Sequence, residues 1–269
     1  MQEFLVRTSH KPRLLPTGRW VISQRWNDLL FAHWPVPASS IAALLPAGLQ
    51  VDTFQGSAWL GVTPFWLDRI KVRGMPAIPG LRSFPELSLR TLVRDQHTRT
   101  PGTYYLSLDA NNLLAAGLGR ALYNLPYHWA DVRMEQRTER EFWFYSRRRF
   151  AGPPVLFQAR YRGLGPTRKL AESRSGTIEN FLMERSCIYS SNRAGELIRA
   201  NTHRVSSPLE EAEAAIERND LAAAVGIQLP AQEPVLHYMR RLAVYIWPAE
   251  LARPVVATRR VTAAVTPSG

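Results

Sequence analysis

Cysteine and lysine are both scarce in this chain. Cys187 is the single cysteine among 269 residues, which excludes an intrachain disulfide framework and a thiolate-rich zinc site. It lies in "MERSCIYSS", where apolar and polar residues alternate, as is typical of a small buried thiol. The only lysines are Lys11, Lys71 and Lys169.

Long apolar runs are also missing. No stretch approaches the roughly 18 apolar residues of a membrane span, and the N-terminal "MQEFLVRTSHKPRLLP" lacks the apolar core of a secretory signal. We therefore predict a cytoplasmic protein that does not enter a membrane.

The basic charge has an unusual composition. The formal net charge is +12, and of the 34 basic residues three are lysines, which leaves 31 arginines. They are spread along the chain, and the densest run, residues 147–149, is interpreted as a solvated strand end. This spread argues against a nucleic-acid partner, for which binding would weaken steeply with salt.

Proline and glycine recur at short intervals, and the segments between them are aromatic and β-branched. This pattern predicts an α+β fold that is predominantly antiparallel β, with a few helices and enough strands to close a sheet. We expect one domain over residues 1–251 and a flexible tail over residues 252–269. The expected strands lie within residues 18–31, 49–67, 86–95, 102–110, 130–137, 141–150, 155–163, 197–205 and 236–247.

Three segments are expected to be helical. Residues 39–45 predict a short helix, and residues 111–125 predict one whose apolar stripe faces the core. Residues 207–220 predict a surface helix, with Ser207 as N-cap, Pro208 as its first residue and Glu210 completing a capping box. The stripe of the second helix consists of Leu114, Leu118, Ala121 and Leu122.

Glu86 and Arg90 are candidate site residues. On a strand their spacing places both on one face, with Leu87 and Leu89 on the other. If that face is the interior, the carboxylate and the guanidinium could hold each other charged and recognise a substrate carboxylate or enol. On an outer face they would form an ion pair worth under about 1 kcal/mol.

Tyr127 and His128 follow a helix that ends near Tyr123 and a break at Pro126. They therefore fall at the entry to the next strand. An unperturbed His128 could act as general acid or base near neutral pH, and Tyr127 could donate a hydrogen bond to a developing oxyanion. The alternative is an aromatic turn in which Tyr127 caps the core.

Other candidates carry weaker signals. His33 and His203 are interpreted as structural histidines that could also line a pocket, and Glu184 and Tyr189 could line one as well. No histidine pair has metal-ligand spacing, and no complete phosphate, dinucleotide or hydrolase motif is present, so we predict neither a metal nor a cofactor.

Six blocks follow one another along the chain: "FAHWPV", "LLPAGLQVDTFQGSAWLGVTPF", "FPELSLRTLV", "PGTYYLSLDANNLLA", "YNLPYHWA" and "GTIENFLMERSCIYSS". In this order they resemble the DUF2071 (YqjF-like) family. That family is similar in turn to the acetoacetate decarboxylase superfamily, which implies a closed or cone-like, mostly antiparallel β-barrel.

The distant relationship also implies a site. Acetoacetate decarboxylases carry Gly-Phe-Pro-Lys-Lys-x-Ala, and "NLPYHWA" resembles it with Tyr127 and His128 in the lysine positions. Neither side chain is a primary amine, so no Schiff base can form there. Glu86 resembles the family's active-site glutamate, and Arg25 or Arg90 its arginine.

We therefore expect a cofactor-independent enzyme that acts on a small carboxylate or β-dicarbonyl metabolite by acid/base chemistry, as a lyase, isomerase, dehydratase or cyclase. His128, Tyr127 and Glu86 are its expected catalytic groups, and Arg90 anchors the anion. The alternative is a non-catalytic small-molecule-binding barrel. A homo-oligomer is compatible with either.

Overall fold

The computed structural model describes residues 17–76, 78–81, 83–149, 153–168 and 176–252, and all but the first residue of the expected tail lies outside these ranges. No helix within them is long and apolar enough to cross a membrane. The strands are β1 (Ile22–Val36), β2 (Leu49–Val51), β3 (Ala58–Val72), β4 (Ser83–Asp95), β5 (Pro101–Ala110), β6 (Tyr127–Gln136), β7 (Glu141–Arg148), β8 (Leu156–Arg168), β9 (Cys187–Ser191), β10 (Leu197–Ser206), β11 (Leu209–Asn219) and β12 (Val235–Leu251). The helices are α1 (Ala38–Ala42), α2 (Leu113–Tyr123) and α3 (Ile178–Met183), with a 3₁₀ turn at Ala223–Val225.

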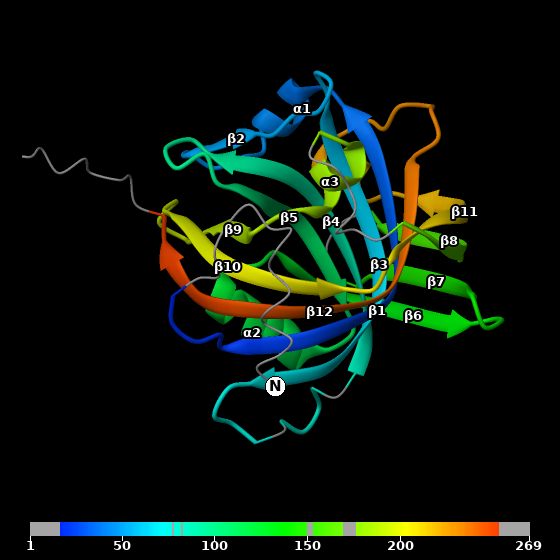
Figure 1. Cartoon of the computed structure of the whole chain (residues 1–269), viewed down its shortest axis with the longest axis horizontal. Helices are drawn as coiled ribbons and strands as arrows, with labels where there is room; N and C mark the ends of the chain where they lie inside the picture. Colours follow the sequence, from blue (N-terminus) through cyan, green and yellow to red (C-terminus); the bar gives the residue numbers. More distant parts are fainter. Residues whose placement is uncertain (1–16, 77, 82, 150–152, 169–175, 253–269) are drawn as a thin grey trace, which may run out of the picture.

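All twelve of these strands belong to one sheet, in the order β10-β9-β5-β6-β7-β8-β11-β12-β1-β3-β4-β2. Further pairings join β10 to β12 and β5 to β4, so hydrogen bonding runs in a circuit through β4, β5, β9, β10, β12, β1 and β3. Figure 1 shows β6, β7, β8 and β11 extending from this circuit on one side. Only the pairs β5–β6 and β5–β9 are parallel among the described pairings, which confirms the predominantly antiparallel sheet with few helices.

The strands β1, β3 and β4 are buried on both faces. Leu87 and Leu89 of β4 pack in the cluster that includes Phe144 and Phe157 of β7 and β8. The opposite face of β4 joins a second cluster, which contains Phe65. Period-two alternation therefore gives each of these strands contacts with two separate cores.

The helix predicted over residues 207–220 is wrong, because this segment forms β11. Ala212, Ala214 and Ile216 of β11 lie against the first core, and the intervening glutamates point outward. Glu213 pairs with Arg162 and Glu217 with Arg160 on the neighbouring strand β8. Cross-strand ion pairs and sheet hydrogen bonds thus outweigh the helix propensity of alanine and glutamate.

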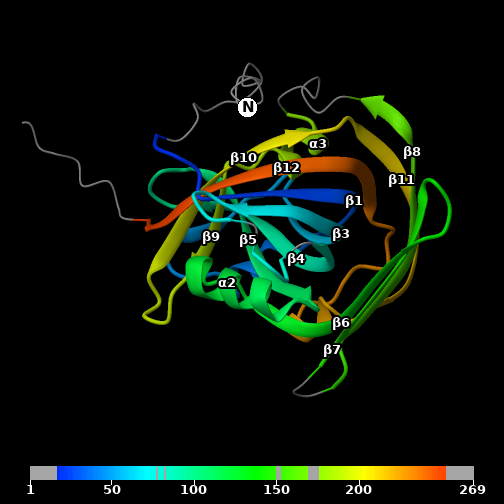
Figure 2. The same cartoon turned by 90° about the horizontal axis from the view of Figure 1, so that it is seen from below.

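The helix predicted over residues 111–125 is confirmed as α2, but the face expected to be buried is wrong. Ala116 and Tyr123 are buried, whereas the side chains of Leu114 and Leu122 are 43% and 44% exposed. Small residues of the helix face the sheet, because Gly119 lies directly against the ring of Tyr127 on β6. Figure 2 shows α2 running beside β5 and β6.

Candidate functional site

Glu86 places a carboxyl group in a small apolar pocket inside the circuit of strands. The side chain is only 4% exposed. The pocket has a volume of about 80 Å³, and its walls come from β1, β3, β4, β5, β6, β9, β12 and α2. Most lining residues are apolar, including Trp26, Leu67 and Phe84. The side chains with polar groups are Gln24, Glu86, Tyr105, Tyr123 and Tyr127. We call this cavity the Glu86 pocket.

Tyr127 is the first residue of β6, and its side chain enters the pocket. Its position after a helix and a proline predicted that it would lie at the entry to a strand. Helix α2 ends at Tyr123, and its C-cap residue Asn124 has a left-handed backbone (φ 49°) and turns the chain towards β5. The backbone N–H of Leu108 then donates to the Pro126 carbonyl at 3.0 Å, and β6 begins beside β5. The Tyr127 hydroxyl donates to Glu86 Oε2 at 3.1 Å.

Burial keeps both groups protonated near neutral pH. Desolvation raises the pKa of Glu86 to about 8, although the hydrogen bond from Tyr127 acts in the opposite direction. Desolvation also raises the pKa of Tyr127 well above its usual range, and the nearby Glu86 adds to this effect. The Glu86 pocket therefore holds a neutral carboxylic acid and a neutral phenol at pH 7, in surroundings with little water.

The packing of Tyr127 depends on Gly119 of α2. A Cβ atom at Gly119 would lie 2.3 Å from Tyr127 Cε2, which is far closer than two carbon atoms can approach. The absence of a side chain at this position therefore allows the helix to cover the ring.

Replacing Gly119 with alanine should destabilise the protein by about 1–3 kcal/mol, because the new methyl group overpacks the Tyr127 ring. Gly117→Ala is a matched control on the same helix, since nothing lies within 4 Å of its Cβ position. It should stabilise by up to about 1 kcal/mol through helix propensity. Urea unfolding of both variants measures the difference, and equal stabilisation by both would contradict the close packing.

The structure does not bring His128 together with Tyr127 and Glu86. Adjacent residues of a strand point to opposite faces, and His128 lies outside the circuit, exposed, beside a surface hollow bordered by Arg147, Arg148 and Arg149. Partial burial, and then the charges of Arg148 and Arg120, lower its pKa to about 4. His128 is therefore neutral at pH 7 and cannot contact a ligand held by Glu86.

Glu86 and Arg90 share a buried face of β4, as the sequence predicted, but they do not pair with each other. They are four positions apart along the strand, which corresponds to a rise of about 13 Å. Glu86 contacts Tyr127, whereas Arg90 lies beside Tyr105, whose side chain also lines the Glu86 pocket. Tyr105 therefore stands between Glu86 and Arg90, and its position was missed from the sequence.

Of the other candidates, His33 lies in the same interior and Arg25 does not. His33 of β1 is 1% exposed, and neither ring nitrogen has a hydrogen-bond partner. Arg25 points away from the pocket and forms an ion pair with Asp68, while its neighbours Gln24 and Trp26 line the cavity. His203 of β10 is 1% exposed and its ring centroid lies 6.3 Å from that of Tyr245, outside the lining of the Glu86 pocket.

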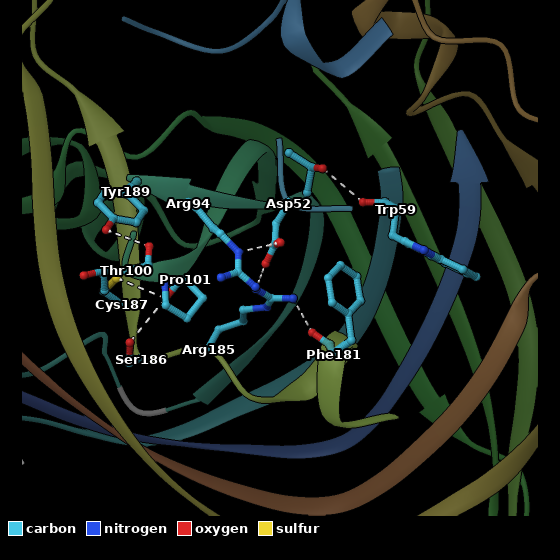
Figure 3. Close-up of polar contacts among 11 residues, drawn as sticks. Asp52, Trp59, Arg94, Thr100, Pro101, Phe181, Arg185, Ser186, Cys187 and Tyr189 are labelled. Atoms are coloured by element: carbon cyan, nitrogen blue, oxygen red, sulfur yellow. Dashed lines mark hydrogen bonds and ion pairs between the residues drawn. The ribbon is translucent and has the colours of Figure 1, made fainter. Parts of the chain in front are cut away.

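The segment after α3 contributes a residue that we did not select. Glu184 caps the end of α3 and does not line the pocket. Tyr189 is part of a separate buried cluster and donates to the Thr100 carbonyl at 3.2 Å (Figure 3). Arg185, between them in sequence, is buried and bonds to the Asp52 carboxylate. Because residues 52 and 185 are far apart in the chain, no local pattern indicates this pair.

Cys187 is fully buried, which confirms the small-thiol interpretation, and its Sγ donates to the Pro101 carbonyl at 3.5 Å. Among the described residues no three His, Cys, Asp or Glu side chains gather as a metal site. Lys71 is exposed on β3, while Lys11 and Lys169 lie outside the described ranges.

The fold is that of the acetoacetate decarboxylase-like proteins. The enduracididine biosynthesis enzyme MppR, in complex with pyruvate, has a TM-score of 0.61 at 12% identity, covering 90% of this chain and 93% of that chain. An acetoacetate decarboxylase-like enzyme from Sphingomonas wittichii RW1 has a TM-score of 0.60 at 14% identity, covering 91% of this chain and 99% of that one.

The chain belongs to the DUF2071 family of uncharacterized conserved proteins, whose profile matches residues 23–243. It is 38% identical over 242 residues to the uncharacterized protein YqjF of Bacillus subtilis (strain 168), which spans 90% of this chain and 97% of that protein. The family resemblance read from the sequence blocks is therefore confirmed, and the more distant resemblance is confirmed for the fold.

Proposed function

We propose that this protein is a cofactor-independent enzyme that moves protons on a small carboxylate or β-dicarbonyl metabolite in the Glu86 pocket. The observation that carries the proposal is the buried Glu86, which has a pKa of about 8 and is hydrogen-bonded to Tyr127 in apolar surroundings. A group with a pKa near the working pH is suited to both accept and donate protons during a reaction.

The two groups have complementary roles in this mechanism. The Glu86 carboxylate, which is about a tenth of the population at pH 7, removes a proton from the carbon next to the substrate carbonyl. The C–H electron pair becomes the C=C bond of an enolate, and the Tyr127 hydroxyl donates to the enolate oxygen. Protonated Glu86 then returns the proton to carbon, or to a leaving group in a lyase or dehydratase reaction.

The chemistry proposed here does not use a Schiff base. Tyr127 and His128 occupy the positions that resemble the lysine pair of acetoacetate decarboxylases, and Lys71 is exposed on the outside of β3. Tyr127 therefore supplies a hydrogen bond where the related enzymes place an amine.

The size of the pocket and one related structure support a small substrate. A volume of about 80 Å³ admits only a few non-hydrogen atoms, and the related enzyme MppR has been solved with pyruvate bound. In this proposal the pocket holds only the reacting carbonyl end, and the substrate carboxylate extends past Tyr105 to Arg90, which shares a face of β4 with Glu86 but does not line the pocket.

The test is exchange of substrate protons with solvent. The full-length protein is incubated in D₂O with pyruvate, acetoacetate, oxaloacetate or acetylacetone, and proton NMR follows both exchange and new products. We expect catalysed exchange or turnover that rises with pH up to about 8, as Glu86 ionises. Absence of both with all four compounds would contradict an enzyme of this substrate class.

Tyr127→Phe should lower kcat by about 10²- to 10³-fold with little change in KM, because the lost hydrogen bond is strongest to the developing enolate. The phenyl ring still fills the space beside Gly119, so the fold should be retained. Tyr145→Phe is the matched control, since its ring stacks on Trp143 of β7. Equal kcat for Tyr127→Phe and the wild type would remove the phenol from the mechanism.

A non-catalytic binding protein is the second candidate, and the mostly apolar lining of the Glu86 pocket favours it. In that case one of the four compounds would bind, as measured by calorimetry, without exchange or product. Glu86→Gln would then change the affinity alone.

A further inference from the structure

His33, Gly61 and Arg90 form one row across three neighbouring strands. Gly61 of β3 pairs with His33 of β1 on one side and with Arg90 of β4 on the other. A Cβ atom at Gly61 would lie 2.7 Å from His33 Cδ2 and 3.6 Å from Arg90 Cγ. The glycine therefore lets both side chains lie against the strand, on the face that also carries Glu86.

Arg90 is a buried cation without a carboxylate partner. Its side chain is 2% exposed, its Nε has no hydrogen-bond partner, and no ion pair joins it to an acidic residue in the described part of the chain. Its guanidinium carbon lies 5.2 Å from the centre of the Phe31 ring. Burial lowers its pKa to about 10, so the group remains charged at pH 7.

A second buried cation, Arg185, is only partly neutralised. Its side chain is 3% exposed, and it bonds to Asp52 Oδ2 and to the Phe181 carbonyl, as Figure 3 shows. Arg94, which is 37% exposed, occupies the other oxygen of the same carboxylate at 2.6 Å. Two guanidiniums thus share one carboxylate, and the Arg185 Nε has no partner.

The two cations lie near each other in the interior, because Arg185 bonds to Asp52, and the backbone N–H of Asp52 donates at 3.0 Å to the carbonyl of Leu92, two residues along β4 from Arg90. Desolvation lowers the pKa of Arg90, and the charge of Arg185 lowers it further. Burial likewise lowers the pKa of His33 well below its usual value, with contributions from Arg90 and Arg185. Both nitrogens of the neutral His33 ring lack partners, so its N–H is available to a ligand.

Cations outnumber the carboxylate that bonds to them here. Arg90, Arg94 and Arg185 carry three positive charges, and Asp52, which is bonded to two of them, carries one negative charge. Burying uncompensated cations is costly, and apolar side chains of similar size would be more stable. A negatively charged ligand would offset that cost and use the unpartnered donors.

We propose that Arg90 and Arg185, with His33, bind the charged end of a dianionic substrate, either a dicarboxylate or a phosphate monoester. This inference rests on the proposed function, because the site adjoins the Glu86 pocket through Tyr105 and assigns the substrate class of that pocket. The carbonyl end of the substrate lies towards Glu86 and Tyr127, and the two negative charges lie towards the arginines.

Binding of simple anions to the full-length protein tests the assignment. Calorimetry and thermal unfolding are measured with succinate, inorganic phosphate and acetate at matched ionic strength. Succinate or phosphate should bind at least about 10-fold more tightly than acetate, because a second charge-assisted contact is made. Tighter binding of succinate would indicate a dicarboxylate substrate, and tighter binding of phosphate would indicate a phosphate monoester. Equal responses to succinate, phosphate and acetate, or no response, overturn the proposal whether or not any variant folds.

Arg90→Met locates the site. It should weaken binding of the preferred dianion by about 10- to 100-fold, and the melting temperature without ligand should not fall, since a buried unpaired charge has been removed. Arg160→Met removes the same charge from an exposed position on β8 and should leave binding unchanged. Unchanged binding in Arg90→Met would place the anion elsewhere and overturn the assignment.

These outcomes are separate from those of the exchange assay. Proton exchange on pyruvate without selective dianion binding would refute the dianion site and retain the acid/base enzyme. Selective dianion binding lost in Arg90→Met, without exchange on any compound, would refute the enzyme and retain the binding site.

Discussion

Glu86→Gln should make the protein more stable than the wild type at pH 8–9, with little difference at pH 5. The pKa of Glu86 is about 8 in the folded protein against a usual value of 4.5. Below pH 4.5 the Glu86 carboxyl is protonated in both the folded and the unfolded chain, so the stabilising contribution of the protonated group is fully present. Between pH 4.5 and about 8 it ionises in the unfolded chain but stays protonated in the folded protein, so the unfolding free energy falls as the pH rises and the contribution is lost by about pH 8. The shift corresponds to at most on the order of 5 kcal/mol. Glutamine cannot ionise and keeps an oxygen that accepts from Tyr127.

Urea unfolding of the two proteins at pH 5, 6, 7, 8 and 9 measures this difference. The gap in unfolding free energy should widen with pH and become constant above about pH 8. Parallel stability profiles, or a variant that is less stable at every pH, would show that Glu86 is ionised or solvated in the folded protein. That result would also remove the basis of the acid/base proposal.

Asp109→Ala should destabilise the protein by about 3–5 kcal/mol, because it leaves a buried guanidinium without its counter-ion. Asp109 of β5 is 1% exposed and accepts hydrogen bonds from Arg148 at 2.8 Å and from Ser146 at 3.1 Å. Arg148 also donates to Ser107 at 2.6 Å. Chemical unfolding at neutral pH measures the loss.

Asp131→Ala is the matched control. Asp131 lies on β6 and pairs with Arg133, but its side chain is 25% exposed and that of Arg133 is 62% exposed. Such pairs contribute at most about 1 kcal/mol. A loss of similar size in both variants would mean that Asp109 and Arg148 are accessible to water in solution. Partial recovery in Asp109→Leu combined with Arg148→Met would confirm that the unpaired charge is the cause.

Sequence patterns predicted the strands that are rich in aromatic and β-branched residues. They predicted a helix instead of a strand where the segment is rich in helix-forming residues. The segment that forms β11 begins with Ser-Pro-Leu-Glu and is rich in alanine and glutamate, which is also how a helix begins. Its strand conformation depends on hydrogen bonding to β8, about 50 residues earlier in the chain, and on packing of its alternate apolar residues against the first core. Local propensity cannot report a partner at that distance in sequence.

The site could be predicted in part. The spacing of Glu86 and Arg90 fixed a shared face, and Pro126 fixed the entry of Tyr127 to a strand. Which of Tyr127 and His128 points inward depends on register, because Tyr127 pairs with Leu108 and His128 with Asp109. A shift of one residue would exchange the two side chains, and the sequence alone does not determine that register.

The pairing of the first described strand with the last has a consequence for biosynthesis. β12 is hydrogen-bonded to β1, β10 and β11, so the sheet cannot be completed until the final strand has left the ribosome. Until then, the nascent chain presents one unpaired edge of β1 to solvent, a condition that favours aggregation. Truncation before β12 would leave β1 paired with β3 alone.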